Sequence, residues 1–116
     1  MIPARGLVEK EIGLVPRTPI AIAATGVTFN LALEDICGVA TRYILEIPNY
    51  TTGSPTTTLS IINANGVTIY TGPAFTEYAN YSIPIDIELI GDYTVRLTLS
   101  GAAGAETVVY FTMFLS

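Results

Sequence analysis

The 116-residue sequence contains no histidine, no tryptophan and a single cysteine, Cys37. Without histidine, general acid–base chemistry falls to carboxylates, tyrosines and Lys10, and neither a Ser–His nor a Cys–His pair can form. One cysteine cannot close an intramolecular disulfide, and without histidine it cannot complete a zinc site. We therefore expect a chain that is not an enzyme and holds no metal or cofactor. We expect Cys37 to be a small buried or half-buried thiol, in a protein made in a reducing cytoplasm.

Charge is also scarce. Charged residues make up 13% of the sequence, about half of the ~25% that is typical, whereas apolar residues reach 50%. The net charge is −5, and the five basic residues are scattered, so no patch can neutralise several phosphates of a nucleic acid. No apolar run approaches the ~18 residues of a membrane span. We expect the apolar side chains to be buried in a core and in contacts with other protein, with neither nucleic acid nor membrane as a partner.

Residues 1–19 differ from the remainder, because they combine three prolines with charged residues and an irregular set of apolar residues. We interpret them as an N-terminal arm preceding a single domain at residues 20–116. Arg5, Glu9, Lys10 and Glu11 interrupt the continuous apolar run that a secretory signal needs, so we expect synthesis in the cytoplasm without a signal peptide.

From Ile20 onward, apolar and polar residues alternate with a period of two, which is typical of half-buried strands. Turn residues separate the segments, and no helical period appears. The pattern predicts an all-β, antiparallel β-sandwich of seven to eight strands, with a closed barrel as the alternative. The expected strands lie near residues 20–24, 27–33, 42–47, 56–64, 67–71, 83–89, 93–99 and 107–115.

Two local features sharpen this prediction. Asn65-Gly66 suits the two positive φ angles of a type I′ hairpin, which would place Ile61 opposite Tyr70 and Ile62 opposite Ile69. Pro84 cannot donate to a ladder, so its strand should lie at an edge.

The stretch GDYTVRLTLSG, residues 91–101, is followed by a glycine-rich turn and a final apolar strand. It resembles the last hairpin of immunoglobulin-like domains, in which a tyrosine packs at the sandwich corner; Tyr93 would be that tyrosine. Because the chain has no Cys…Trp…Cys framework, it looks like the disulfide-free members found in bacterial surface proteins and bacteriophage virions. With its arm, it is similar in organisation to small head decoration (cement) proteins. That resemblance implies a virion component that binds a capsid or tail lattice, often as a homotrimer, and it transfers no individual functional residue.

The sequence indicates partner-binding residues in two places. The arm is too short to fold alone, and the last strand is apolar on both sides, so one side would be exposed unless the arm or another subunit covers it. Both alternatives remain open at this point. The residues are Leu7, Val8, Ile12, Leu14 and Val15 in the arm, and Val108, Tyr110 and Phe114 in the last strand.

The polar and loop residues give weaker evidence for a functional site than the apolar residues do. The pair Glu34–Asp35 is interpreted as a turn, and the pair Asp86–Glu88 as part of a solvated strand face; both interpretations are favoured over an acid–base dyad. A calcium site would need further oxygen ligands, such as Asn63 and Asn65. The loop aromatics Tyr50, Tyr78, Tyr81 and Phe75 could stack on sugar rings, although such residues more often cover the core. A carbohydrate-binding or adhesin-type module is therefore the alternative function, and an enzyme is the third.

Overall fold

The computed structural model describes residues 13–50, 55–76 and 78–116. These residues form one antiparallel sheet of six strands in the order β1-β6-β2-β5-β3-β4. The strands are β1 (Gly13–Ile22), β2 (Thr28–Ile47), β3 (Thr57–Asn63), β4 (Thr68–Phe75), β5 (Ala79–Leu99) and β6 (Thr107–Leu115). The described residues include no helix long and apolar enough to cross a membrane.

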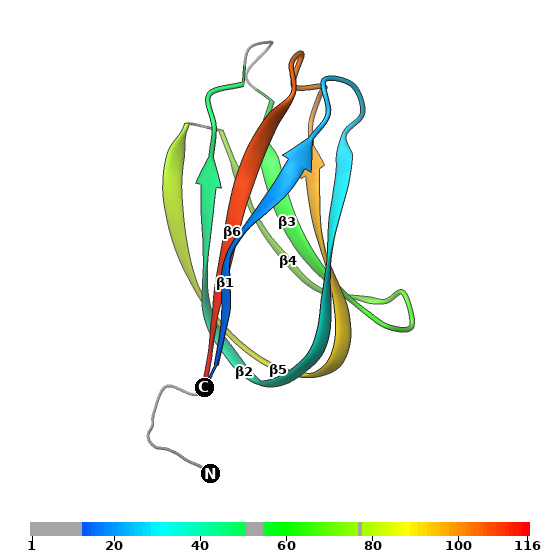
Figure 1. Ribbon diagram of the computed structural model, residues 1–116, viewed down its shortest axis with the longest axis vertical. Helices are drawn as coiled ribbons and strands as arrows, with labels where there is room; N and C mark the ends of the chain where they lie inside the picture. Colours follow the sequence, from blue (N-terminus) through cyan, green and yellow to red (C-terminus); the bar gives the residue numbers. More distant parts are fainter. Residues whose placement is uncertain (1–12, 51–54, 77) are drawn as a thin grey trace.

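The single sheet is folded into two layers because β2 and β5 are each about twice as long as the ~10-residue upper limit of ordinary strands. Both run along one layer, curve together through the lower end of the view and return in the other layer (Figure 1). The first layer contains β1, β6, residues 39–47 of β2 and residues 79–89 of β5. The second contains residues 28–33 of β2, residues 93–99 of β5, β3 and β4.

The chain is therefore all-β and antiparallel, with a two-layer sandwich architecture, as the alternation predicts. The strand number differs from the expected seven or eight because two pairs of predicted strands are continuous: residues 28–47 form one strand, and so do residues 79–99. Strand connectivity also differs from the immunoglobulin order, in which the two layers are separate sheets. Here hydrogen-bonded strands pass from one layer to the other, as at the corners of orthogonally packed sheets.

The bend is made by a bulge in β2 and a glycine in β5. Glu34 and Asp35 of β2 lie opposite Asp92 alone, because the register shifts between the pairs Leu33–Tyr93 and Ile36–Gly91. Asp35 has a φ of 55° and Gly91 a φ of 106°, a left-handed conformation that glycine adopts at little cost. The extra residue needs a hydrogen-bond acceptor, and the Asp35 N–H donates to Asp92 Oδ1 at 3.0 Å. The acidic pair predicted as a turn is thus a bulge at the corner.

Tyr93 lies beside this bulge. Its hydroxyl accepts a hydrogen bond from the Ile90 N–H at 2.8 Å and donates to the Ile90 carbonyl at 3.1 Å. These bonds fix the backbone of Ile90, directly before Gly91. The expectation that Tyr93 packs at the sandwich corner is confirmed, although the corner lies within a strand rather than between two.

The core lies between the layers and consists of the inward side chains of every strand. At its centre, the ring of Tyr43 packs edge-on against Tyr70 with centroids 5.9 Å apart, and their hydroxyl oxygens are 3.1 Å apart. Tyr43 lies in the first layer and Tyr70 in the second, so this hydrogen bond joins the layers. Gly72 leaves room for it, because a Cβ at that position would lie 2.5 Å from the Tyr43 hydroxyl. Burial and the Tyr70 hydroxyl raise the pKa of Tyr43 far above its ordinary value.

Two features of the predicted chain organisation need correction. The boundary at residue 20 lies within β1, since residues 13–15 and 18–22 already pair with β6; residues 1–12 lie outside the described residues. Cys37 is exposed rather than buried or half-buried, because it lies on the bend of β2.

The predicted hairpin is present, but its turn is of a different type. Ile61 lies opposite Tyr70 as expected, whereas Ile62 lies opposite Thr68 rather than Ile69. Gly66 has a φ of 82° and donates to the Asn63 carbonyl, while Asn65 is not among the residues with positive φ. This is the three-residue loop with a type I turn and a left-handed glycine, in place of the type I′ turn. The Asn63 side chain stabilises it by accepting from the N–H groups of Asn65 and Val67.

The edge position of Pro84 is confirmed. Residues 79–87 of β5 pair with β2 on one side, whereas β3 pairs only with residues 93–99 of the same strand. The segment with Pro84 therefore forms the edge of the first layer.

The corner gives a first prediction. Tyr93→Phe removes the hydroxyl that holds Ile90, and we expect the free energy of unfolding in urea to fall by about 1 kcal/mol, the usual value of such a bond. Tyr78→Phe is the matched control, since Tyr78 is 72% exposed. Equal changes in the two variants would show that the Tyr93 hydroxyl does not stabilise the corner.

Candidate functional site

The outward side of β6 lies in the middle of the first layer, between β1 and β2. Along β6, buried side chains alternate with half-buried ones, so the strand is apolar on both sides as predicted. We call the outward surface the β6 face. It consists of Val108, Tyr110, Thr112 and Phe114 of β6, Leu14 and Arg17 of β1, and Arg42 and Glu46 of β2.

Three of these residues form a fixed cluster across three strands. Glu46 lies opposite Tyr110 in the register of β2 and β6. Arg17 lies in the bulge of β1 between Val15 and Thr18, and its guanidinium donates to Glu46 from Nε at 2.7 Å and from Nη2 at 3.0 Å. The same guanidinium lies over the Tyr110 ring, with Cζ 3.5 Å from the centroid. This combines a bidentate ion pair with a cation–π contact, so the planar group is held in one orientation.

A second cation–π contact lies beside the first. Arg42 of β2 places its Cζ 4.3 Å from the centre of the Phe114 ring. Leu14 pairs with Phe114 from the other side and is 50% exposed. The β6 face therefore presents two aromatic rings, each under a guanidinium, beside an exposed leucine.

The predicted partner-binding residues divide into three groups. Leu14, Val108, Tyr110 and Phe114 lie together on the β6 face. Val15 points into the core and is 8% exposed, because it lies on the opposite side of β1 from Leu14, so its assignment to the binding surface is wrong. Leu7, Val8 and Ile12 lie outside the described residues.

Sequence reasoning missed Arg17, Arg42 and Glu46. Their residue type was a weak signal of function, since charged residues are rare in this chain. Their position on the β6 face could not be predicted, because it depends on the register between strands far apart in the sequence. Arg17 belongs to the predicted arm, and it covers Tyr110 of the same chain. Part of the expected intramolecular cover is therefore present, supplied by the arginine and not by the apolar residues of the arm.

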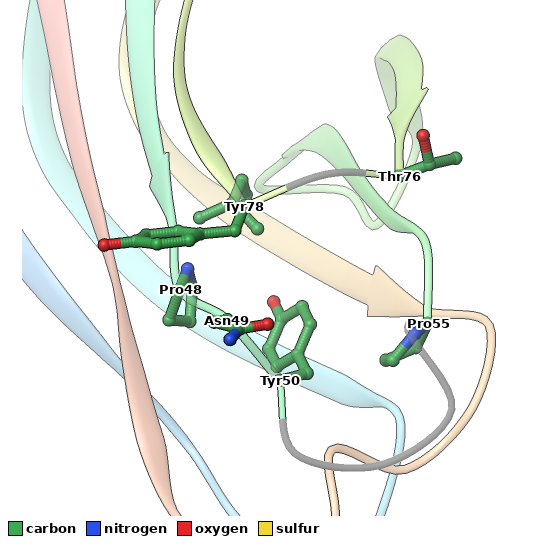
Figure 2. A pocket seen from close by; sticks show the side chains of 7 residues that line it. Pro48, Asn49, Tyr50, Pro55, Thr76 and Tyr78 are labelled. Carbon is green, nitrogen blue, oxygen red and sulfur yellow. The ribbon is translucent and has the colours of Figure 1, made fainter.

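A separate aromatic site lies at one end of the sandwich. Ile47, Pro48, Asn49, Tyr50, Pro55, Thr76 and Tyr78 line a hollow of about 60 Å³. In Figure 2 the ring of Tyr78 extends over Pro48, while the ring of Tyr50 lies between Pro48 and Pro55 in this view. Enclosing ligand pockets measure roughly 300–1,000 Å³, so this hollow can serve only as a shelf on which a flat group stacks.

The four aromatic residues predicted for this end have different roles. Phe75 is buried and stacks on Tyr81 at a centroid distance of 4.1 Å. The Tyr50 hydroxyl lies 2.9 Å from Thr57 Oγ1, and burial raises the pKa of Tyr50. These three aromatic residues cover the core, which is the more ordinary role. Tyr78, by contrast, is 72% exposed and available to a ligand.

The polar candidates do not form a second site. Asp86 and Glu88 are exposed on the outward side of β5. Glu34, Asn63 and Asp92 line one hollow near the bend, but the Asn63 oxygen accepts from its own turn and Asp92 Oδ1 from Asp35. In the described part of the chain, no three acidic or cysteine side chains gather as metal ligands would.

Comparisons with known proteins concern the fold. No family model matches the chain, and no curated protein matches it in sequence. A solved family 36 carbohydrate-binding module in complex with calcium and xylotriose is 18% identical, over 81% of this chain and 77% of its own, with a TM-score of 0.49. A module of the same family, from a xylanase of the Trinervitermes trinervoides hindgut metagenome, is 14% identical over 80% of this chain and 74% of its own, with a TM-score of 0.47.

Viral capsid domains are similar as well. The Penaeus vannamei nodavirus P-domain is 15% identical, over 85% of this chain and 96% of its own, with a TM-score of 0.37. At these identities, the likeness assigns neither a ligand nor a partner to this chain.

The Arg17–Glu46 pair gives a pH prediction. Hydrogen bonding to Arg17 lowers the pKa of Glu46. Because the native pKa is below the unfolded one, the pair stabilises the fold above the unfolded pKa, and this contribution is lost as the pH falls through the native pKa. Glu46→Gln should lower the free energy of unfolding slightly near pH 7, by less than about 1 kcal/mol, and leave it unchanged near pH 2.

Glu88→Gln is the control, because Glu88 has no charged partner among the described residues. The measurement is urea unfolding at both pH values. A Glu46→Gln effect that persists undiminished in acid would show that the ion pair is not its cause.

Proposed function

We propose that this protein is a non-enzymatic structural protein of a virion, which binds a capsid or tail lattice in the manner of decoration (cement) proteins. The β6 face is the attachment surface. Leu7, Val8 and Ile12 extend it, and on the lattice sister subunits complete the assembly as a homotrimer. In this proposal, the protein acts by adhesion: it performs no chemistry, and burial of its surface holds neighbouring lattice subunits together.

The observation that supports the proposal is the fixed cluster of Arg17, Glu46 and Tyr110. Arginine and tyrosine are enriched among the residues that dominate protein interfaces. Binding normally costs the ordering of such side chains, but here the ion pair and the ring already hold the guanidinium in place. With Phe114 and exposed Leu14 beside the cluster, the face combines an apolar centre with a few directed polar groups, as protein interfaces do.

The composition of the chain supports a protein partner. Few charges surround the β6 face, and its two arginines are occupied by rings and by Glu46. It therefore offers no dense positive field to a polyanion. The net charge of −5 keeps the free protein soluble.

The test uses particles that lack the chain, prepared from the source of the sequence by deleting its gene. Recombinant protein added back should cosediment with them, and Arg17→Glu should weaken binding at least about tenfold, as expected for a central interface residue. Arg17 is exposed, so the variant should fold.

Arg96→Glu is the matched control, since Arg96 also donates from Nε, to Asn30 Oδ1 at 3.0 Å, but faces outward from the second layer. It should bind as wild type does. Absence of the chain from purified wild-type particles, or equal binding by the two variants, would overturn the proposal.

The alternative function, a carbohydrate-binding module, is favoured by one observation, the exposed ring of Tyr78 at the shelf with Asn49. An exposed aromatic ring beside an amide is a suitable platform for a sugar, because the ring contacts the apolar face of the sugar and the amide bonds its hydroxyls.

A glycan array tests this alternative. A signal from the wild-type protein should disappear in Tyr78→Ala and persist in Tyr50→Phe, which keeps the ring and loses only the bond to Thr57. Silence of the wild-type protein on broad arrays would count against glycan binding and leave the lattice proposal untouched.

A further inference from the structure

The two layers of the sandwich have four free strand edges among the described residues, and three of them contain proline. The edge of the first layer at β1 has Pro16 and Pro19, and its other edge, at β5, has Pro84. In the second layer, β4 has Pro73. Proline removes a backbone donor, and natural sheets use it to prevent pairing with other chains.

The fourth edge is residues 28–33 of β2. They pair with β5 on one side, while β6 pairs only with the other half of β2, from Ala40 onward. Every second residue of this stretch therefore presents its N–H and carbonyl to the surroundings. In Figure 1 this part of β2 lies at the outer margin of the sandwich.

The sequence of this edge lacks the usual protection. Residues 27–33 read VTFNLAL and include no charge, no proline and no glycine. Val27 is 41% exposed, and Phe29 and Leu31 are half-buried and pack against the core from this edge. An uncharged, unprotected edge with exposed apolar side chains is a template for strand addition.

We propose that this edge pairs with the same edge of a second copy of the chain, in an antiparallel arrangement that extends the second layer across a two-fold axis. Antiparallel pairing of one segment with itself is self-complementary and closes after two copies, so it does not lead to fibres.

Pairing with a second copy brings no like charges together. With the axis at Asn30, the two Glu34 carboxylates lie at opposite ends of the paired segment, roughly 27 Å apart at 3.4 Å per residue. No charged residue lies opposite a like charge within the pairing. The dimer edge belongs to the second layer, so it leaves the β6 face of each copy free, and the inference is independent of the lattice proposal.

The experiment is sedimentation equilibrium of the full chain over a range of concentrations. Wild type should reach the mass of a dimer. Thr28→Lys with Ala32→Lys places like charges opposite or diagonal to one another across the proposed pairing, and should raise the dissociation constant at least about tenfold. Both residues are exposed on the outward side of β2, so the variant should fold.

Thr71→Lys with Ala74→Lys is the matched control. It makes the same two substitutions at exposed positions of β4, the edge with Pro73, and should dimerise as wild type does. Hydrogen exchange adds a direct readout, since alternate amides of residues 28–33 should exchange more slowly at high than at low concentration.

A wild-type monomer at all concentrations would overturn the inference. So would a dimer that the β2 and β4 variants weaken equally, or one in which these amides gain no protection. A dimer lost in Arg17→Glu but kept in the β2 variant would instead place self-association on the β6 face.

Discussion

The fold depends on β2 and β5 turning the same corner together while they remain hydrogen-bonded. If only one strand bent, the ladder between them would break, and the two layers would lose their connection. The bulge at Asp35, the acceptor that Asp92 supplies, the left-handed Gly91 and the hydroxyl of Tyr93 all lie within this corner. Asp92 and Tyr93 bind backbone groups at the bend, and the bulge and Gly91 let the chain adopt the bent conformation. Because the corner joins the layers, it also determines which strand segments become edges.

The same geometry separates the surfaces of the molecule. The first layer presents β6 between two neighbours, which cover its aromatic rings with Arg17 and Arg42. The second layer ends at residues 28–33, where backbone rather than side chains is available. One surface can recognise a partner through fixed side chains and the other through strand pairing, and neither requires a conformational change. The shelf at Tyr78 is a third, smaller surface at the end of the sandwich.

Much of this arrangement follows from period-two alternation, because strand direction and side-chain side are local properties. The two-sided character of β6 was predictable in this way. The edge position of Pro84 followed instead from its missing backbone donor, and the corner position of Tyr93 from the resemblance to the last hairpin of immunoglobulin-like domains. Continuity through the corner was not predictable, since the bulge at Glu34–Asp35 breaks the alternation and resembles a turn. The cluster of Arg17, Glu46 and Tyr110 was not predictable either, because it depends on the register of three strands that are distant in the sequence. Val15 was misplaced for a related reason, as a short irregular segment does not show which side of a strand it belongs to.

The close approach of Gly72 to the Tyr43 hydroxyl has a consequence for how this sequence can change over time. A Cβ at position 72 would lie 2.5 Å from that oxygen, so the buried Tyr43 ring would have to shift to admit any side chain there. The hydroxyl in turn holds Tyr70 across the core. Loss of the Tyr43 hydroxyl would remove the closest contact and the bond between the layers, but the Tyr70 hydroxyl would still lie 3.1 Å from an added Cβ. The residues at positions 43, 70 and 72 are therefore constrained by one another.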